Sequence, residues 1–124
     1  MHELVKRHSI LAAGLLLVAC ASPQPPTREL KSASGAIRAA QEMEADEFPQ
    51  ASLHLVLARE SLAKAERLIA DEKMQSAKVL LARARADAEL ALTLARVEKT
   101  RIAARRVARQ VTALERETAR RAAR

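Results

Sequence analysis

Aromatic residues are almost missing from this chain of 124 residues, which has no Trp, no Tyr and a single Phe. The cores of β-sandwiches and α/β sheets rely on aromatic and β-branched side chains, so this composition argues against both classes. Glycine is scarce as well, with two residues, and all four prolines lie at or before position 49. Ala, Leu, Arg, Glu and Lys, the strongest helix formers, dominate the remainder. The composition therefore predicts an all-α domain.

Cysteine occurs once, at Cys20, so no intramolecular disulfide is possible and helix packing must stabilise the fold. The residues before it are typical of an export signal. Lys6 and Arg7 are basic, residues 10–18 are apolar, and Ala19 is the small residue that a signal peptidase requires. The apolar run is far shorter than the roughly 20 residues that cross a bilayer as a helix. We therefore expect a cleaved signal over residues 1–19 and no transmembrane helix.

The sequence LVAC at residues 17–20 resembles the lipobox of bacterial lipoproteins, and all four positions match. The resemblance implies cleavage before Cys20, a diacylglycerol on its sulfur and a further acyl chain on the new amino terminus. Several acyl chains together anchor a protein firmly. Ala21 and Ser22, and no Asp, follow the cysteine, which for lipoproteins implies the periplasmic face of the outer membrane. A plain secretory signal with an unrelated cysteine is the alternative.

Three of the four prolines lie in residues 20–27, where we expect an extended tether that leads to a helical domain over residues 28–124. From there on, apolar residues recur at alternating steps of three and four, the spacing of one buried stripe on a helix. Helices are predicted over residues 28–46, 50–71 and 72–121. Phe48-Pro49 separates the first two, because proline disfavours a helical residue before it and suits the first turn of a new helix.

The last two helices have facing seams in which large and small residues alternate, which predicts an elongated antiparallel helical hairpin with coiled-coil-like packing. The predicted core positions are Leu30, Ala33, Ile37 and Ala40 in the first helix, Phe48, Ala51, Leu55, Ala58, Leu62, Ala65 and Ile69 in the second, and Met74, Ala77, Leu81, Ala84, Ala88, Ala91 and Ala95 in the third.

The third helix is predicted to be much longer than the second, so its outer half extends beyond the hairpin. That half has a rotated seam of its own, formed by Val97, Thr100, Ala104, Val107, Val111, Leu114 and Thr118. Folding about residue 72 sets residue 30 opposite residue 114, so we expect the first helix to cover this seam. Acidic residues would then meet basic ones, namely Glu42, Glu44, Asp46 and Glu47 facing Arg96, Lys99 and Arg101. The alternative is that both groups are solvated.

The net charge of +7 is concentrated at the end of the chain, because residues 96–124 contain ten basic and three acidic side chains. Such a basic arm suggests an anionic partner: peptidoglycan, lipopolysaccharide, acidic phospholipid or an acidic protein surface. We name Arg105, Arg106, Arg109 and Arg116 as the candidate site. Nucleic acid is not expected, since an exported lipoprotein does not meet it and no aromatic residue follows Phe48. A solvated helix end that complements the helix dipole, and an amphipathic helix lying on a membrane, are the alternatives.

A second candidate surface lies on the second helix, where Leu53, Leu57 and Leu68 form a minor apolar stripe roughly opposite the main seam. This stripe is either a partly exposed face, as Lys64 in its middle suggests, or the place where a partner protein or a second copy docks. A homo-oligomer therefore stays open.

The chain after the predicted signal peptide has no recognisable set of catalytic residues. His54 is the single histidine there, no free cysteine is left and no Gly-rich loop occurs, so nucleophile, base and phosphate cradle are all absent. We expect His54 on the surface or at the flank of the seam. Acidic pairs such as Asp71-Glu72 are explained by turns and helix ends. We therefore expect no enzyme activity, no metal site and no cofactor other than the lipid on Cys20.

The run from Leu30 to Leu94, with its Ala-rich helices, the break at residues 47–49 and the series Ala77 to Ala91, resembles a family of bacterial lipoproteins, the helical domain of unknown function 4398. Members often have Tyr-Ala-Pro where this chain has Glu47-Phe48-Pro49. Some continue into an OmpA-like peptidoglycan-binding domain, for which this sequence has no matching residues. The family has no assigned site, so the resemblance implies only an envelope lipoprotein whose hairpin extends from the outer membrane toward the cell wall.

Two functions follow as expectations. The first is a structural or adaptor lipoprotein that binds another envelope protein through its hairpin. The second is a direct binder of an anionic envelope polymer or lipid through the arginines of the arm. The first is preferred, because the residues of the hairpin are more regularly patterned than those of the arm.

Overall fold

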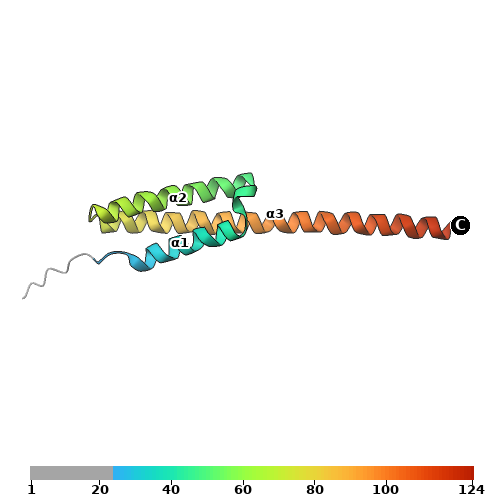
Figure 1. Ribbon diagram of the computed structural model, residues 1–124, viewed down its shortest axis with the longest axis horizontal. Helices are drawn as coiled ribbons and strands as arrows, with labels where there is room; N and C mark the ends of the chain where they lie inside the picture. Colours follow the sequence, from blue (N-terminus) through green and yellow to red (C-terminus); the bar gives the residue numbers. More distant parts are fainter. Residues whose placement is uncertain (1–23) are drawn as a thin grey trace, which may run out of the picture.

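The computed structural model describes residues 24–124, and all regular elements in that range are helical. They are α1 (Thr27–Glu42), the short 3-10 helix η1 (Ala45–Glu47), α2 (Pro49–Ala70) and α3 (Met74–Ala122). Helices α1 and α2 pack along the first half of α3, whose second half projects as a straight rod (Figure 1). The all-α prediction is confirmed. The predicted signal peptide and Cys20 lie outside the described residues.

Two short reversals set the order of the helices. Pro49 opens α2, and Phe48 before it is extended, with φ −110° and ψ 118°, as the residue before a proline prefers. At the other end of α2, Glu72 adopts the left-handed conformation with φ 60°, and the Lys73 N–H donates to the Leu68 carbonyl at 2.8 Å. This is the common way in which a helix ends and the chain turns back. The predicted tight turn near residue 72 is confirmed.

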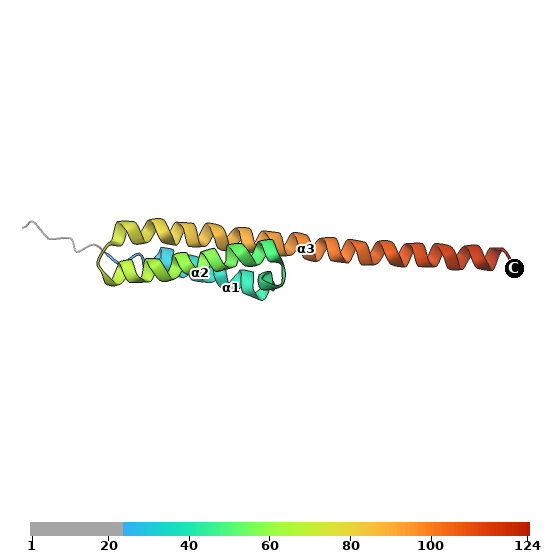
Figure 2. The same ribbon diagram turned by 90° about the horizontal axis from the view of Figure 1, so that it is seen from above.

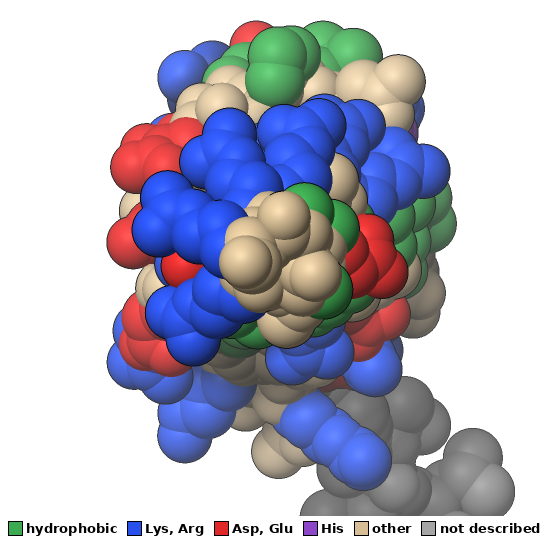
Figure 3. Space-filling model, turned by 90° about the vertical axis from the view of Figure 1, so that its right-hand side faces the viewer, with side chains coloured by type: hydrophobic (Ala, Val, Ile, Leu, Met, Phe, Trp, Pro, Cys, Tyr) green, Lys and Arg blue, Asp and Glu red, His purple; other side chains and the backbone are tan. Residues whose placement is uncertain are grey.

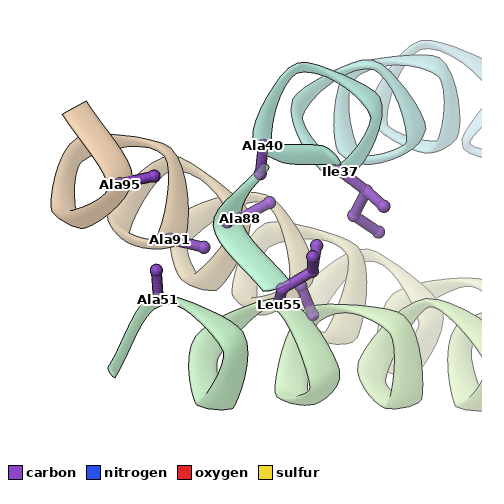
Figure 4. Close-up of a cluster of buried hydrophobic side chains, with 9 residues drawn as sticks. Ile37, Ala40, Ala51, Leu55, Ala88, Ala91 and Ala95 are labelled. Atoms are coloured by element: carbon purple, nitrogen blue, oxygen red, sulfur yellow. The ribbon is translucent and has the colours of Figure 1, made fainter. Parts of the chain in front are cut away.

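The interface between α2 and α3 follows the predicted seams. Leu55 and Leu81 are the largest fully buried side chains, and alanines surround them. Figure 4 shows Leu55 of α2 among the alanines of α3, with Ile37 of α1 nearby. Most predicted core positions are buried, namely Ala33, Ile37, Ala40, Ala51, Leu55, Ala58, Ala65, Ala77, Leu81, Ala84, Ala88, Ala91 and Ala95. The other predicted core positions, Leu30, Phe48, Leu62, Ile69 and Met74, are half-buried. Ser61, which was not predicted as a core position, is buried.

The predicted position of the first helix is wrong. Helix α1 does not continue the line of α2 along the outer half of α3. It runs beside α2 and the inner half of α3, which gives a three-helix body (Figures 1 and 2). Ala33 packs with Ala65, Leu81 and Ala84. The chain reverses between α1 and α2 because Glu44 is left-handed, with φ 59°.

The composition of α3 explains why the body ends where it does. Its buried seam continues beyond Ala95, in the same steps of three and four, through Glu98, Ile102, Arg105 and Arg109. A helix packed on that face would bury guanidinium groups without partners, which is strongly unfavourable. The rotated seam at Val97 lies on the opposite side of α3, and none of the helices in residues 24–124 covers it. Every residue from Arg101 to Arg124 is exposed.

We call residues 101–124 the arm and the packed part, residues 27–95, the body. With 49 residues, α3 is about 74 Å long. One predicted contact between the acidic and basic groups is present, since Lys99 donates to the Glu44 carboxylate. Arg101 instead pairs with Glu98 on its own helix at 2.6 Å. Among residues 24–124, no helix has the length and apolar character that crossing a bilayer requires.

Candidate binding surfaces

The four arginines proposed as an anionic site lie on one face of the arm. Successive residues of a helix are about 100° apart, which places Arg105, Arg106, Arg109 and Arg116 within roughly 100° of one another. All four are exposed, and no ion pair joins them to an acidic side chain of residues 24–124. Figure 3, which looks onto the free end of α3, shows Lys and Arg side chains gathered over much of this end. The arm therefore presents a concentrated basic face.

The opposite face of the arm is apolar. Val107, Val111 and Leu114 have exposed fractions of 47 to 66%, and Val97, just before the arm, is 40% exposed. Their mean direction is about 180° from that of the four arginines, by the same helix geometry. The four arginines therefore lie on the side of the helix opposite the apolar stripe. Glu115 and Glu117 lie at the edges of the stripe. The amphipathic character predicted for the arm is present, with both faces in solvent.

The second predicted surface is narrower than expected. Leu53 is 58% exposed, whereas Leu57 and Leu68 are half-buried. None of the three belongs to either of the two buried clusters of the body. Val56, which the sequence analysis did not name, is 44% exposed beside Leu53 and extends the apolar surface at this end of α2. A partner that docks here would contact mainly Leu53 and Val56.

A polar contact between α2 and α3 was missed. The His54 Nδ1 lies 3.1 Å from the Asp87 Oδ1, and the side chains are only 28% and 17% exposed. Arg83 approaches the other carboxylate oxygen of Asp87 at 3.8 Å. His54 was expected at the flank of the seam, which is where it lies, but its partner is 33 residues away. No local pattern identifies such a partner. The contact links α2 to α3.

Hollows on the described surface are open and shallow. One of them, with a volume of about 430 Å³, lies between α1 and α3, where Arg28, Ser32 and Ala82 contribute to its walls. Arg85 and Glu89, also at this wall, are paired with each other at 2.7 Å. Within residues 24–124 no three His, Cys, Asp or Glu side chains gather as a metal site would need. The surfaces available for binding are therefore helix faces.

The comparisons with known proteins give a family match. Residues 28–107 match the family described as Domain of unknown function (DUF4398). That match includes α1, α2 and α3 as far as Val107, so it covers the whole body and the first part of the arm. No curated protein and no solved structure matches the chain.

Proposed function

The chain belongs to the DUF4398 family, and we propose that it is a lipid-anchored, non-enzymatic adaptor of the bacterial cell envelope. The lipobox-like LVAC sequence at residues 17–20 supports the anchor, with acyl chains on Cys20. Ala21 and Ser22 after the cysteine support the periplasmic face of the outer membrane. The lipid is the only group that the chain carries in this proposal.

The observation that carries the adaptor function is the shape of the molecule. A closed body of three helices bears an arm whose residues are all exposed, so residues 24–124 offer long helix faces and open, shallow hollows. Leu53 and Val56, exposed on the outside of α2, supply an apolar contact for a partner protein. Large apolar side chains at the centre of a contact contribute most to the affinity of protein interfaces.

The anchor is tested with the variant Cys20→Ser in the cells that produce the protein. We expect labelled palmitate to enter the unchanged chain and not the variant. The unchanged chain should sediment with outer-membrane fragments, whereas the variant should be released with the periplasmic contents. A variant that keeps both label and membrane association would remove the lipid anchor from the proposal.

The adaptor surface is tested by a photo-crosslinking amino acid at Leu53 in the anchored protein. The matched control carries it at Arg59, which is exposed on another side of α2. We expect one discrete cross-linked protein from position 53, absent from position 59 and absent when Val56 is changed to Ser. Equal products from both positions would mean that α2 has no specific partner.

The second candidate function is favoured by the basic face of the arm. Arg105, Arg106 and Arg109 are exposed, and together with Arg116 they form a cationic strip that fits an anionic polymer such as peptidoglycan. Binding through such a strip should weaken with salt, because mobile ions screen exposed charges.

Co-sedimentation with purified cell-wall sacculi tests this candidate. The test variant changes Arg105, Arg106 and Arg109 to Gln. The control changes three exposed arginines of the body, Arg38, Arg59 and Arg67, so both variants lose the same charge. If the arm binds the wall, the test variant alone should lose sedimentation at low salt. Loss in both variants would indicate attraction by net charge, and no binding by the unchanged chain would exclude the candidate.

A further inference from the structure

The uncovered side of α3 carries an apolar stripe that runs through both the body and the arm. Helices α1 and α2 lie on one side of α3 and leave the other free along its whole length (Figure 2). Leu90, Val97, Ala104 and Val111 follow one another at intervals of seven residues, as do Val107 and Leu114. All six are exposed. We call these six residues the outer stripe.

The spacing of the outer stripe is that of a coiled coil. Two interleaved series with a period of seven residues place apolar side chains every 3.5 residues, which is the repeat of two helices wound around each other. The first series runs from Leu90 to Val111 over three heptads, whereas in the second series Thr93 and Thr100 precede Val107 and Leu114. Both series are apolar from Ala104 to Leu114, which is the part best suited to a coiled coil. Within the described residues, no helix of the same chain fills this position.

The charges beside the outer stripe are divided between its two ends. Arg96 and Arg101 flank the part near the body, and Glu115 and Glu117 flank the part near the carboxyl terminus. Glu89 and Arg121 have the reverse signs at the two ends, and each is paired within its own helix. In a parallel pair, Arg96 of one chain would lie next to Arg101 of the other, and like charges would repel. In an antiparallel pair, each arginine meets a glutamate. The stripe is therefore complementary to itself in one direction only.

We infer that the outer stripe pairs antiparallel with the same stripe of a second copy, so that the protein is a homodimer. With Val97 opposite Leu114 of the second copy, Ala104 faces Val107 of the second copy, a small residue against a large one as in the body. In this register Arg96 lies beside Glu117 of the second copy, and Arg101 lies near Glu115 of the second copy.

A membrane fits this surface less well than a second copy. Amphipathic helices that lie on anionic membranes are rich in Lys and Arg on the polar face, which anionic lipids attract. Acidic residues beside the apolar face would be repelled by such lipids. Here Glu115 and Glu117 border the outer half of the stripe, and Arg105 and Arg109 lie on the far side of the helix. In the dimer those arginines stay in solvent, free to meet an anionic partner.

The dimer rests on the described residues and does not depend on the proposed function. It does bear on the anchor, since the start of α1 lies at the end of the body far from the arm (Figure 1). An antiparallel pair sets the two amino-terminal ends at opposite ends of a rod. Lipids on both copies would then hold the rod along one membrane surface.

Engineered cysteines test both the pairing and its direction. In the full chain with Cys20→Ser, the double variant Val97→Cys and Leu114→Cys should form a covalent dimer on mild oxidation. Each single variant should not, because equal positions of an antiparallel pair are about 26 Å apart at this site. Residues 97 and 114 of one chain are equally distant along the helix, so they cannot bridge each other.

The mass in solution gives a second readout. The chain with Cys20→Ser should have the mass of two copies, and Val107→Asp with Val111→Asp should halve it while helix content by circular dichroism stays the same. Arg96→Glu should weaken the dimer, as should Glu117→Arg, and the two changes together should restore it. That rescue is expected only if the two residues meet across the dimer.

Three results would overturn the inference. Efficient cross-linking of the single variants would mean a parallel pair. A chain that stays a monomer at every concentration tested would mean that the stripe serves another partner. A monomer that floats with vesicles of anionic phospholipid, and stops floating when Val107 and Val111 become Asp, would assign the stripe to a membrane.

Discussion

The inner and outer halves of α3 are one continuous helix, yet one half is packed and the other bare. Along a single face, the inner half has Ala84, Ala88 and Ala91, all fully buried. The outer half has Arg105 and Arg109 at the equivalent positions of the same seam, both exposed. Since the steps of three and four do not change between the halves, the residue type alone decides where packing stops.

The opposite face of α3 is apolar in both halves and yet uncovered. There the apolar pattern passes from Leu90 in the inner half to Val111 and Leu114 in the outer half without a break. Neither α1 nor α2 covers any part of it. Periodicity therefore identifies a face that can pack, whereas the availability of a partner decides whether it does.

The two halves of α3 should differ most in how a charge placed in the seam changes the free energy of unfolding. Leu81→Glu buries an unpaired carboxylate at a position that is 1% exposed, and it should lower the free energy of unfolding by more than about 4 kcal/mol. Ile102→Glu, at an exposed position of the same seam, should change it by less than about 0.5 kcal/mol. Chemical denaturation followed by circular dichroism measures both. A tolerant Leu81 would contradict the packing of the body.

Larger side chains should also affect the stability of the two halves of α3 differently, although by less than a buried charge. Ala88 lies at a close approach of three helices, so Ala88→Leu should destabilise the body by about 1–3 kcal/mol through overpacking. Ala113→Leu adds the same atoms to an exposed site on the arm and should leave the midpoint of thermal unfolding unchanged. If the two leucine variants melt alike, the alanines of α3 do not set the distance between its neighbours.

The contact between His54 and Asp87 allows a finer test. Asp87→Ala removes the hydrogen-bond partner of a half-buried histidine and should lower the free energy of unfolding by about 1 kcal/mol. Arg83→Ala, which removes only the exposed outer partner, should have an effect close to zero. Because Arg83 and His54 share Asp87, equal losses in both variants would mean that the carboxylate acts through Arg83 instead.

Removal of the arm should have the smallest effect on the body. A chain that ends at Ile102 keeps every buried residue, so the free energy of unfolding measured at low protein concentration should agree with that of the full chain within about 0.5 kcal/mol. The same truncation should abolish any dependence of the melting temperature on concentration, because it deletes most of the outer stripe. A large loss of stability in the dilute monomer would show that the arm supports the body.

Much of this architecture could be predicted from the sequence, and the reason is the regular spacing of Ala and Leu. The seams of α2 and α3, the break at Pro49 and the overhang of α3 all follow from local pattern. The position of α1 does not, because it depends on the reversal at Glu44. Left-handed backbone is signalled by Gly or Asn, and a glutamate gives no such signal.

Some features of the candidate surfaces could be predicted from the sequence and others could not. The exposure of Arg105 and its neighbours was predictable, since a run of arginines without acidic partners stays in solvent. The narrowing of the α2 surface to Leu53 and Val56 was not, because the burial of Leu57 and Leu68 depends on how the helices pack. The pair His54 and Asp87 was likewise hidden, since its members are distant in sequence.

The most direct test of this account is a distance measurement by pulsed electron paramagnetic resonance. One spin label is placed at Glu29 of α1 and a second at either Ala82 or Ala113 of α3, with an excess of unlabelled chain so that only distances within one molecule are recorded. Glu29 and Ala82 border the same hollow, so their labels should be close. Ala113 lies about 46 Å further along the helix, and its label should be far away. A short distance from Glu29 to Ala113 and a long one to Ala82 would put α1 over the arm and contradict the fold described above.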